Sequence, residues 1–297
     1  METQYNEQWF KQHALNSIKK MGEGVWDYSD SLLLYLPAGE KEYESIQKGD
    51  DPYAKLVTVP ERQYLKNIAE AIVAELPDEF EFIDLGPGTA HKEQDIFDAA
   101  GRAGKKFIYR PVDISPRYLQ LAQEYAQAQG VEVLPLRASF EELPELLGAS
   151  TRTRFVSLGL TFTNYEPQTI LALLSRIAGK GGFVFVDVQL RDFVDMKQIQ
   201  SLYETQVSGM FDPKLALLGV SAGDVAGRKV DDGIRAWYTL GKVPPELEKK
   251  GVRPGDTLFV FQSLRYTKDQ FENELQGFTY KIFDMQKSFL GALIWTE

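Results

Sequence analysis

The stretch "EFIDLGPGTAHKE" at residues 81–93 decides the fold. A short apolar run ends in Asp-Leu-Gly-Pro-Gly-Thr and passes directly into a helical pattern. Glycines at such a turn let the backbone approach a ligand closely, and the N-terminus of the following helix offers free amides. A dinucleotide-binding turn typically has a third glycine, where this chain has His91, and Pro87 removes one amide donor. The turn therefore fits a pyrophosphate poorly.

Helical and strand patterns alternate on both sides of this turn. Helical periodicity over 60–76 precedes the first strand, and further strands are predicted at 106–113, 131–136, 153–160 and 183–190. The helix predicted at 115–130 has Ser115 as its cap and Pro116 at its first position. Five βα units in succession predict an α/β fold with a mostly parallel sheet and helices on both faces. Residues 279–287 and 289–296 are expected to close the sheet edge as a hairpin-like pair.

Two regions interrupt this alternation, residues 1–60 and residues 191–262. The second is longer than an ordinary βα connection and mixes a helical part with strand-like pieces. We predict a cofactor-binding core from 61–190 plus 263–297, and a substrate-binding or lid domain from 1–60 plus 191–262. The alternative is a decorative insertion. Six aromatic residues of these regions either line a pocket or pack between the domains: Trp26, Tyr28, Tyr35, Tyr53, Trp237 and Tyr238.

The composition excludes several classes of chemistry. The 297 residues contain no cysteine and only two histidines, so thiolate zinc sites, cysteine nucleophiles and histidine-based metal sites or triads have almost nothing to draw on. A net charge of −10 disfavours nucleic acid and anionic membranes as partners. The absence of a signal pattern, of a bilayer-spanning apolar run and of cysteines favours a cytoplasmic protein. These exclusions favour chemistry supplied by a bound cofactor, and no metal site is predicted.

The ends of the next strands indicate which cofactor. Asp113 ends the second strand, where a carboxylate can hold both hydroxyls of a ribose; alternatively it supports the helix cap at Ser115. Phe140 follows the third strand, where adenine commonly packs, although it is also a plausible core residue. Together with the glycine turn, these residues favour S-adenosylmethionine over NAD.

Three stretches resemble a known family: "DLGPGTAHKE" at 84–93, "YRPVDISPRYL" at 109–119, and "VSLGLTFTNYEPQTILALLSRIAGKGGFVFVDVQL" at 156–190. They are similar to the S-adenosylmethionine-dependent histidine Nα-methyltransferases of ergothioneine biosynthesis, a family that includes a fungal dimethylallyltryptophan N-methyltransferase. The resemblance extends from about residue 57 to 190 and weakens towards the C-terminus. It implies a Rossmann-like class I methyltransferase core with a seven-stranded sheet, and a substrate domain built from the two non-repeating regions.

The resemblance also implies roles for individual residues. It places Gly86, Lys92 and Asp113 among the cofactor contacts, with Lys92 as a partner for the methionine carboxylate or, alternatively, a solvated helix lysine. Gly88 of the glycine turn and the Ser139-Phe140 pair complete the predicted cofactor contacts. Asn164 falls on the asparagine that holds the amino-acid part of the substrate; alternatively it caps the helix that follows. Tyr203 aligns loosely with a substrate-contacting tyrosine, and these two residues are the catalytic candidates.

Two departures bear on the substrate. The family has an Asp-Phe pair where this chain has Ser139-Phe140, and a Glu-x-Ser where it has Phe261-Gln262-Ser263. The missing glutamate is the group that reads the histidine imidazole, and without it that discrimination is lost. With Phe261 and Ser263 as substrate contacts, we predict N-methylation of a small amino acid or amine other than histidine. The alternatives are a methyltransferase acting on a carboxylate, hydroxyl or protein side chain, or a non-catalytic cofactor-binding module. The sequence leaves the oligomeric state open.

Overall fold

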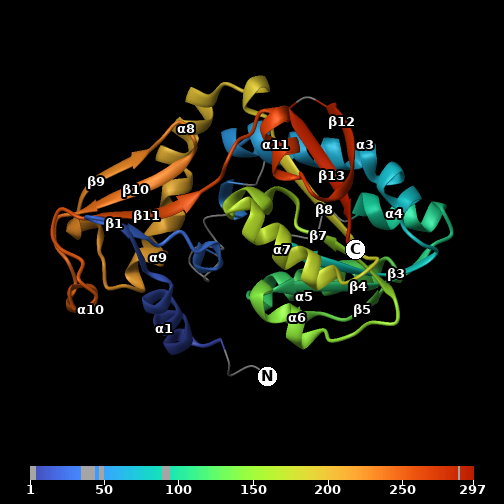
Figure 1. Cartoon of the computed structure of the whole chain (residues 1–297), viewed down its shortest axis with the longest axis horizontal. Coiled ribbons are helices and arrows are strands. Elements are labelled where there is room, and N and C mark those ends of the chain that lie inside the picture. Colours follow the sequence, from blue (N-terminus) through green and yellow to red (C-terminus); the bar gives the residue numbers. More distant parts are fainter. Residues whose placement is uncertain (1–4, 35–43, 47–49, 89–93, 287) are drawn as a thin grey trace. The chain divides into compact units, whose positions relative to one another are not determined.

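The computed structural model describes residues 5–34, 44–46, 50–88, 94–286 and 288–297 (Figure 1). Contacts between Cα atoms divide the chain into two units. One unit comprises Met1–Leu56 with Asp195–Leu264, and the other comprises Val57–Val194 with Arg265–Glu297. We refer to them as the terminal-insert unit and the core unit. A π-helix, η2 (Ala54–Thr58), lies where the first passes into the second.

The core unit contains a mostly parallel sheet with the order β12-β13-β8-β7-β3-β4-β5, and β6 also pairs with β4. The pairs among β3, β4, β5, β6, β7 and β8 are parallel, whereas β13 runs antiparallel to β8 and to β12. The predicted α/β fold and the closing hairpin are therefore confirmed. The strands are β3 (Glu79–Leu85), β4 (Lys106–Asp113), β5 (Glu132–Val133), β6 (Leu136–Arg137), β7 (Thr153–Ser157), β8 (Phe183–Gln189), β12 (Thr279–Gln286) and β13 (Phe289–Trp295).

One predicted strand, at residues 131–136, is divided in the structure into the two short strands β5 and β6. Pro135 stands between them and has no N–H to donate to the ladder. Both pieces pair with β4, at Ile108–Tyr109 and at Val112–Asp113. Together they occupy the place of one strand at this edge of the sheet, so the carboxyl end of β6 still lies beside that of β4.

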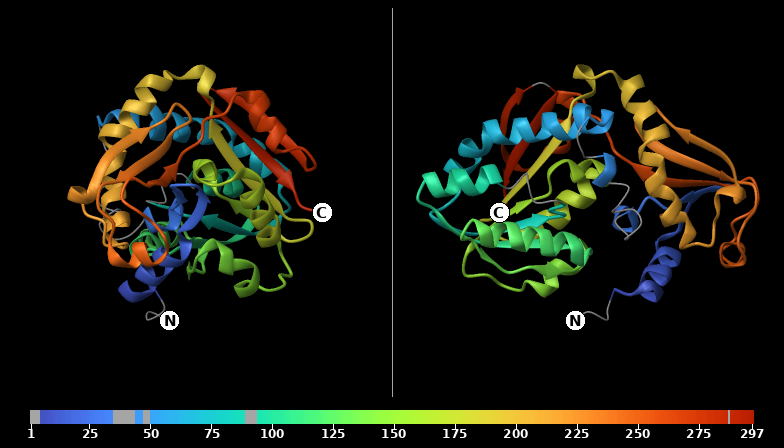
Figure 2. Two further views of the ribbon diagram at one scale, coloured as in Figure 1. Left: turned by 60° about the vertical axis from the view of Figure 1, so that its left-hand side comes forward. Right: turned by 180° about the vertical axis from the view of Figure 1, so that it is seen from behind.

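Helices cover both faces of this sheet (Figures 1 and 2). On one face lie α3, α4 and α5, and on the other α6, α7 and α11. Sequence signals account for their ends: Ser115 accepts a hydrogen bond from the Tyr118 amide at the start of α5, and Gly130 follows its end with a φ of 73°. The helices are α3 (Val59–Glu75), α4 (Gln94–Arg102), α5 (Pro116–Ala128), α6 (Leu143–Leu146), α7 (Pro167–Ala178) and α11 (Lys268–Glu274), with 3-10 turns η3 (Phe140–Glu142), η4 (Gly159–Asn164) and η5 (Arg191–Phe193).

The core of this unit is rich in aromatic rings. Phe82 on β3 packs against Phe97 of α4 and against rings of β4 and β7, with centroids 5.0–6.4 Å apart. One charge is buried in the same strand. Glu81 accepts hydrogen bonds from Arg110 on β4 at 2.6 Å and from Arg154 on β7 at 3.4 Å. Paired in this way, the carboxylate is tolerated inside the sheet.

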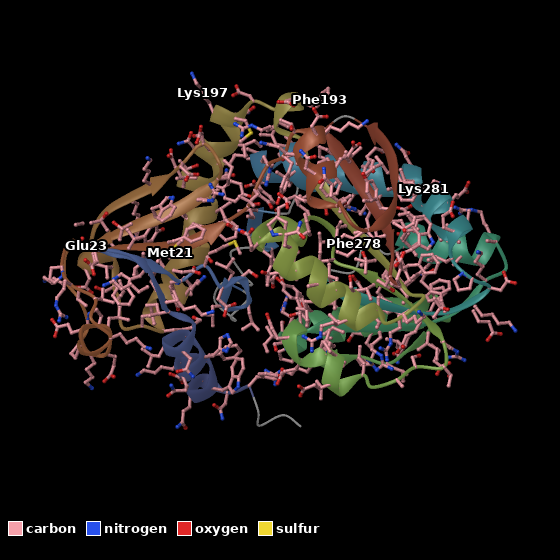
Figure 3. The ribbon with its side chains drawn as sticks, viewed as in Figure 1. Met21, Glu23, Phe193, Lys197, Phe278 and Lys281 are labelled. Carbon is pink, nitrogen blue, oxygen red and sulfur yellow. The ribbon has the colours of Figure 1, made fainter. Side chains whose placement is uncertain are left out.

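The terminal-insert unit contains a second sheet, with the order β1-β2-β11-β10-β9. Only β2 and β11 pair in parallel, while the other neighbours are antiparallel. Met21 on the edge strand β1 is 55% exposed (Figure 3). The elements are α1 (Glu7–Ser17), β1 (Lys19–Gly22), β2 (Val25–Asp27), η1 (Ser31–Leu34), α8 (Met196–Thr205), η6 (Val207–Met210), α9 (Phe211–Ala216), η7 (Ala222–Asp224), β9 (Val225–Val230), β10 (Arg235–Leu240), α10 (Pro245–Lys249) and β11 (Thr257–Gln262).

A β-bulge in β11 decides where Phe261 points. Phe259 pairs with Trp237 and Phe261 with the adjacent Ala236, so Val260 is an extra residue in the strand. The bulge interrupts the alternation of side chains, and residues two apart no longer share a face. Phe259 stacks on the ring of Trp237, whereas Phe261 contacts aromatic rings of α8 and α9.

Candidate active site

The glycine turn follows β3 directly. Gly86 and Gly88 have φ values of 70° and 56°, in the left-handed region that side-chain-bearing residues rarely adopt. The Gly86 amide donates to the Val112 carbonyl on the neighbouring strand at 2.9 Å. A Cβ at Gly86 would lie 3.8 Å from Cζ of Phe140. The turn and this phenylalanine, both predicted as cofactor contacts, are therefore neighbours. Lys92 lies outside the described residues.

Asp113 ends β4 beside this turn and is buried. Its Oδ1 accepts a hydrogen bond from the Ser115 amide at 2.8 Å. The interpretation of Asp113 as a support for the helix cap is therefore confirmed. A carboxylate has two oxygens with several acceptor positions, so this contact is compatible with the ribose interpretation.

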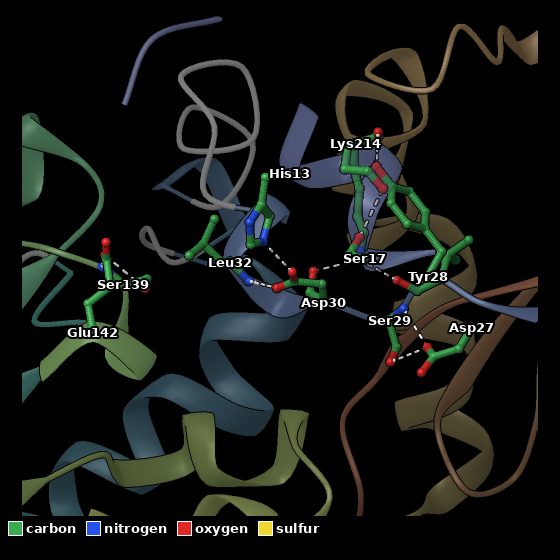
Figure 4. Close-up of polar contacts among 12 residues, drawn as sticks. His13, Ser17, Asp27, Tyr28, Ser29, Asp30, Leu32, Ser139, Glu142 and Lys214 are labelled. Carbon is green, nitrogen blue, oxygen red and sulfur yellow. Dashed lines mark hydrogen bonds and ion pairs between the residues drawn. The ribbon is translucent and has the colours of Figure 1, made fainter. Parts of the chain in front are cut away.

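Ser139 and Phe140 follow β6, at the same end of the sheet. The Ser139 amide and Oγ both donate to Oε2 of Glu142 at 3.0 Å, which closes a capping box around η3 (Figure 4). The Ser139 hydroxyl is thus used in local structure. The Phe140 ring is half-buried and lies 6.5 Å from the ring of Tyr165.

Asn164 is the last residue of η4, which follows the neighbouring strand β7. The interpretation of Asn164 as a helix cap is wrong, because the N-cap residue of α7 is Glu166. Tyr165 and Glu166 have extended backbones and separate Asn164 from that helix. Within the described residues the side-chain amide of Asn164 makes no hydrogen bond, and this side chain is half-buried. It retains a donor and an acceptor for a ligand.

Tyr203, Phe261 and Ser263 come together in the terminal-insert unit. The Tyr203 hydroxyl donates to Oγ of Ser263 at 2.9 Å, and the Tyr203 ring stacks on Phe261 with centroids 5.8 Å apart. Phe211 of α9 contacts the Phe261 ring at 5.2 Å, and Tyr53 lies edge-on to Tyr203 at 6.2 Å. Phe261 and Tyr203 are 5% and 2% exposed. The predicted substrate contacts of this unit therefore form one buried aromatic cluster.

The other aromatic residues that the sequence singled out have partners inside the same unit. Trp26 donates to Asp256 at 2.8 Å, and the Trp237 indole donates to Asp231 at 3.1 Å. Tyr28 and Tyr238 are buried and contact α9. Tyr35 lies outside the described residues. Tyr53 is the member of this group whose ring contacts Tyr203.

Several buried polar residues of the core unit were not singled out from the sequence. Asp84, two residues before Gly86, accepts a hydrogen bond from the Tyr109 hydroxyl at 2.6 Å. Two further buried carboxylates, on Glu61 and Asp187, approach the start of η4, where a Cβ on Gly159 would lie 3.7 and 3.9 Å from them. Phe211 was also missed. Helical periodicity does not reveal it, because α8 ends at Thr205 and the 3-10 turn η6 separates Tyr203 from Phe211.

The described part of the chain contains neither a candidate membrane span nor a candidate metal site. No helix there has the length and apolar character needed to cross a bilayer. The described residues also contain no group of three or more acidic, histidine or cysteine side chains arranged to hold a metal ion.

Comparison with known families decides the class of protein. A model described as "Histidine-specific methyltransferase, SAM-dependent" matches residues 23–191, more than half of the chain. The chain belongs to this family. It is therefore an S-adenosylmethionine-dependent methyltransferase, as the strand ends and the glycine turn predicted. The matched residues end at 191, before Tyr203, Phe261 and Ser263. The family description names histidine, but the match does not include these three predicted substrate contacts.

Solved structures with a similar fold are distant. A SAM-dependent methyltransferase from Aquifex aeolicus is 13% identical, covering 80% of this chain and 98% of its own, with a TM-score of 0.43. An S-adenosylmethionine-dependent methyltransferase from Clostridium acetobutylicum is 13% identical, covering 86% and 98%, with a TM-score of 0.45. No curated protein matches the chain.

The residues at the carboxyl ends of β3, β4 and β6 fit the adenosyl part of S-adenosylmethionine. Gly86 leaves its backbone open to close approach, Asp113 offers a carboxylate suited to a ribose diol, and Phe140 offers an apolar ring to adenine. These residues come from neighbouring strands, at the edge where open parallel sheets bind ligands.

Proposed function

We propose that this methyltransferase methylates the amino group of a small amino acid or amine with an apolar or aromatic side chain, and not histidine. The observation that carries the proposal is Phe261, buried between the rings of Tyr203 and Phe211. The family resemblance implies a glutamate at this position, where it would read an imidazole. An aromatic ring cannot accept the hydrogen bond of an imidazole N–H in place of a carboxylate, and it favours an apolar neighbour.

Roles within the site follow from the chemistry of each side chain. When bound, S-adenosylmethionine supplies a methyl group on a sulfonium, which reacts with an unprotonated amine. We assign Gly86, Gly88, Asp113, Ser139 and Phe140 to holding the cofactor, together with Lys92 as a partner for its carboxylate. Asn164 and Tyr203 would orient the amine, because their side-chain oxygens accept hydrogen bonds from it. Phe261 and Ser263 would contact the rest of the substrate.

The two units would divide these tasks, the core unit holding the cofactor and the terminal-insert unit contributing substrate contacts. The net charge of −10 supports a small molecule over a nucleic acid as the substrate. The absence of cysteine supports action in the cytoplasm.

A product analysis tests the proposal. The protein is incubated with S-adenosylmethionine and, in turn, with L-phenylalanine, L-tyrosine, L-tryptophan, L-leucine and L-histidine. We expect the mass of one of the apolar or aromatic amino acids to rise by one or more methyl groups, with fragmentation placing them on the amine. Methylation of a carboxylate or hydroxyl would contradict the proposed N-methylation. Cofactor binding without turnover on any amine would indicate a non-catalytic module.

Asn164→Ala should lower kcat/KM for the accepted amine by roughly ten- to a hundredfold, because the amine loses an orienting hydrogen bond. Affinity for S-adenosylmethionine, measured by calorimetry, should stay within about twofold of the unchanged protein, which corresponds to a loss of no more than about 0.4 kcal/mol. Asn273→Ala is the matched control, because Asn273 is an exposed asparagine of α11 whose Oδ1 accepts only a local hydrogen bond from Gln276. An equal loss of cofactor affinity in Asn164→Ala would contradict the substrate role.

A further inference from the structure

Lys214 on α9 is fully buried in the terminal-insert unit, and no other lysine of the described residues is buried. Lysine is almost never fully buried unless its amine is paired, since a long polar side chain loses its hydration there. α9 is otherwise apolar on the face that contacts β10 and β11, where Phe211 meets Tyr238 and Phe261. The proposed chemistry does not require a lysine at this position, so its burial needs another explanation.

The Lys214 amine joins three segments of the unit, and Figure 4 shows the lysine beside Tyr28 and Asp30. Nζ donates to the carbonyl of Asp30 at 2.7 Å and to the carbonyl of Val260 at 2.8 Å. It also lies 4.8 Å from the centre of the Tyr28 ring, whose hydroxyl donates back to the Lys214 carbonyl at 2.8 Å. The lysine thus holds α9, the segment after β2 and strand β11 together.

Val260 is the extra residue of the β-bulge that redirects Phe261. The carbonyl that Lys214 binds therefore belongs to the peptide bond immediately before Phe261. Phe211 lies three residues before Lys214 on the same helix and contacts the Phe261 ring at 5.2 Å. Helix α9 thus holds Phe261 in two ways, through its backbone and through its ring.

The charged groups around this amine come from β2, from the segment that follows it and from α1. Asp30 lies 2.7 Å from Nε2 of His13 on α1 and accepts from the Leu32 amide, and Asp27 accepts from Ser29. Burial lowers the pKa of Lys214 to about 7, against the opposing effects of Asp30 and Asp27. Burial raises the pKa of Tyr28 well above its ordinary value. Strand β11 contributes no titratable side chain.

We propose that Lys214 is a positioning residue for the substrate site, which holds the bulge at Val260 so that Phe261 faces Tyr203 and Phe211. Its effect on substrate selection rests on the proposed function, in which Phe261 contacts the substrate. Its effect on the position of the Phe261 ring is independent of the proposed function. An experiment can therefore separate the two.

Lys214→Met removes the amine and keeps an apolar side chain of similar length. The protein is labelled with 4-fluorophenylalanine, and the ¹⁹F resonance of residue 261 is assigned by its loss in Phe261→Leu. We expect Lys214→Met to move this resonance and to raise KM for the accepted amine roughly tenfold, with kcat changed less than threefold. Lys197→Met, at an exposed lysine of α8, is the matched control and should change neither (Figure 3).

A chemical rescue excludes a merely general loss of stability. The chain has no cysteine, so Lys214→Cys carries a single thiol. Alkylation with 2-bromoethylamine in denaturant forms one S–C bond with loss of bromide and a proton, and restores an amine at the length of lysine. After refolding, the resonance and KM should return to within about twofold of unchanged protein taken through the same steps. Lys214→Gln, which keeps two N–H donors, replaces Lys214→Met if that variant does not fold.

The pH dependence of unfolding gives a readout that needs no substrate. An unfolded lysine keeps its proton up to about pH 10.5, whereas buried Lys214 releases it near pH 7. Between these values the unfolded state binds more protons, so stability rises with pH. Relative to Lys214→Met, the unfolding constant of the unchanged protein should fall by up to about tenfold per pH unit above pH 7. Parallel curves would contradict the lowered pKa of Lys214.

The outcomes distinguish the two ideas. A shifted Phe261 resonance together with a raised KM, both restored by aminoethylation, supports the proposal. An unmoved resonance in folded Lys214→Met overturns it, whatever the substrate is. A shifted resonance with unchanged KM overturns the substrate role of Phe261, and with it the proposed specificity, while the positioning by Lys214 stands.

Discussion

Phe261→Glu is expected to lower the free energy of unfolding by about 3–5 kcal/mol at pH 8, the scale for a buried charge without a partner. Phe261 is 5% exposed, with the Tyr203 ring on one side and the Phe211 ring on the other. Phe211 has no hydrogen-bond donor, and the Tyr203 hydroxyl already donates to Ser263. Urea unfolding of the variant and the unchanged protein measures the difference.

The loss should shrink as the pH falls. Burial raises the pKa of a carboxyl group, so the folded state takes up a proton before the unfolded state does, and stability is regained between the two pKa values. Phe261→Leu is the control, with an expected cost of less than about 1.5 kcal/mol and no such pH dependence. A Phe261→Glu protein as stable as the unchanged one would mean that the site accommodates a carboxylate, and the argument against histidine would then fail.

Asp113→Ala is expected to weaken binding of S-adenosylmethionine by about 1–3 kcal/mol, or roughly five- to 150-fold in Kd, because the ribose loses a charged acceptor. Calorimetric titration with S-adenosylmethionine and with its demethylated product measures this directly. Asp113→Asn separates charge from shape, since an amide keeps an oxygen for the cap contact with Ser115.

Ser115→Ala is the matched control for Asp113. It removes the acceptor for the Tyr118 amide at the start of α5 and should cost about 0.5–2 kcal/mol of stability. Cofactor affinity should be unchanged in it, because Asp113 retains its carboxylate. Unchanged affinity in Asp113→Ala would instead limit Asp113 to its role in the helix cap.

The parallel sheet of the core unit could be predicted from the sequence because its signals are local. Each βα unit carries its own periodicity, and Ser115, Pro116 and Gly130 mark the ends of one helix within 16 residues. The second sheet could not be predicted in the same way. Its parallel pair joins β2 at residues 25–27 to β11 at 257–262, and pairing over such a separation leaves no short-range pattern.

In the candidate site, too, some features could be predicted from the sequence and others could not. Gly86 and Asp113 stand at strand ends, so their gathering at one edge of the sheet follows from the strand order. The direction of the Phe261 side chain depends on a bulge at Val260, and this bulge is seen only in the pairing register of β11 with β10. The role of Lys214 could not be predicted either, because a lone lysine in a helix is usually solvated, and only the contacts to Asp30 and Val260 reveal its burial.

A competition assay tests the proposed specificity most directly. L-Histidine, L-phenylalanine, L-tyrosine and L-tryptophan are mixed at equal concentration with the protein and S-adenosylmethionine, and N-methylated products are quantified while conversion is low. The product ratio then equals the ratio of kcat/KM values. We predict that the main product is an N-methylated aromatic amino acid, and that the amount of methylated histidine is less than roughly a tenth of it. Methylated histidine as the main product would contradict the central claim that Phe261 has changed the substrate.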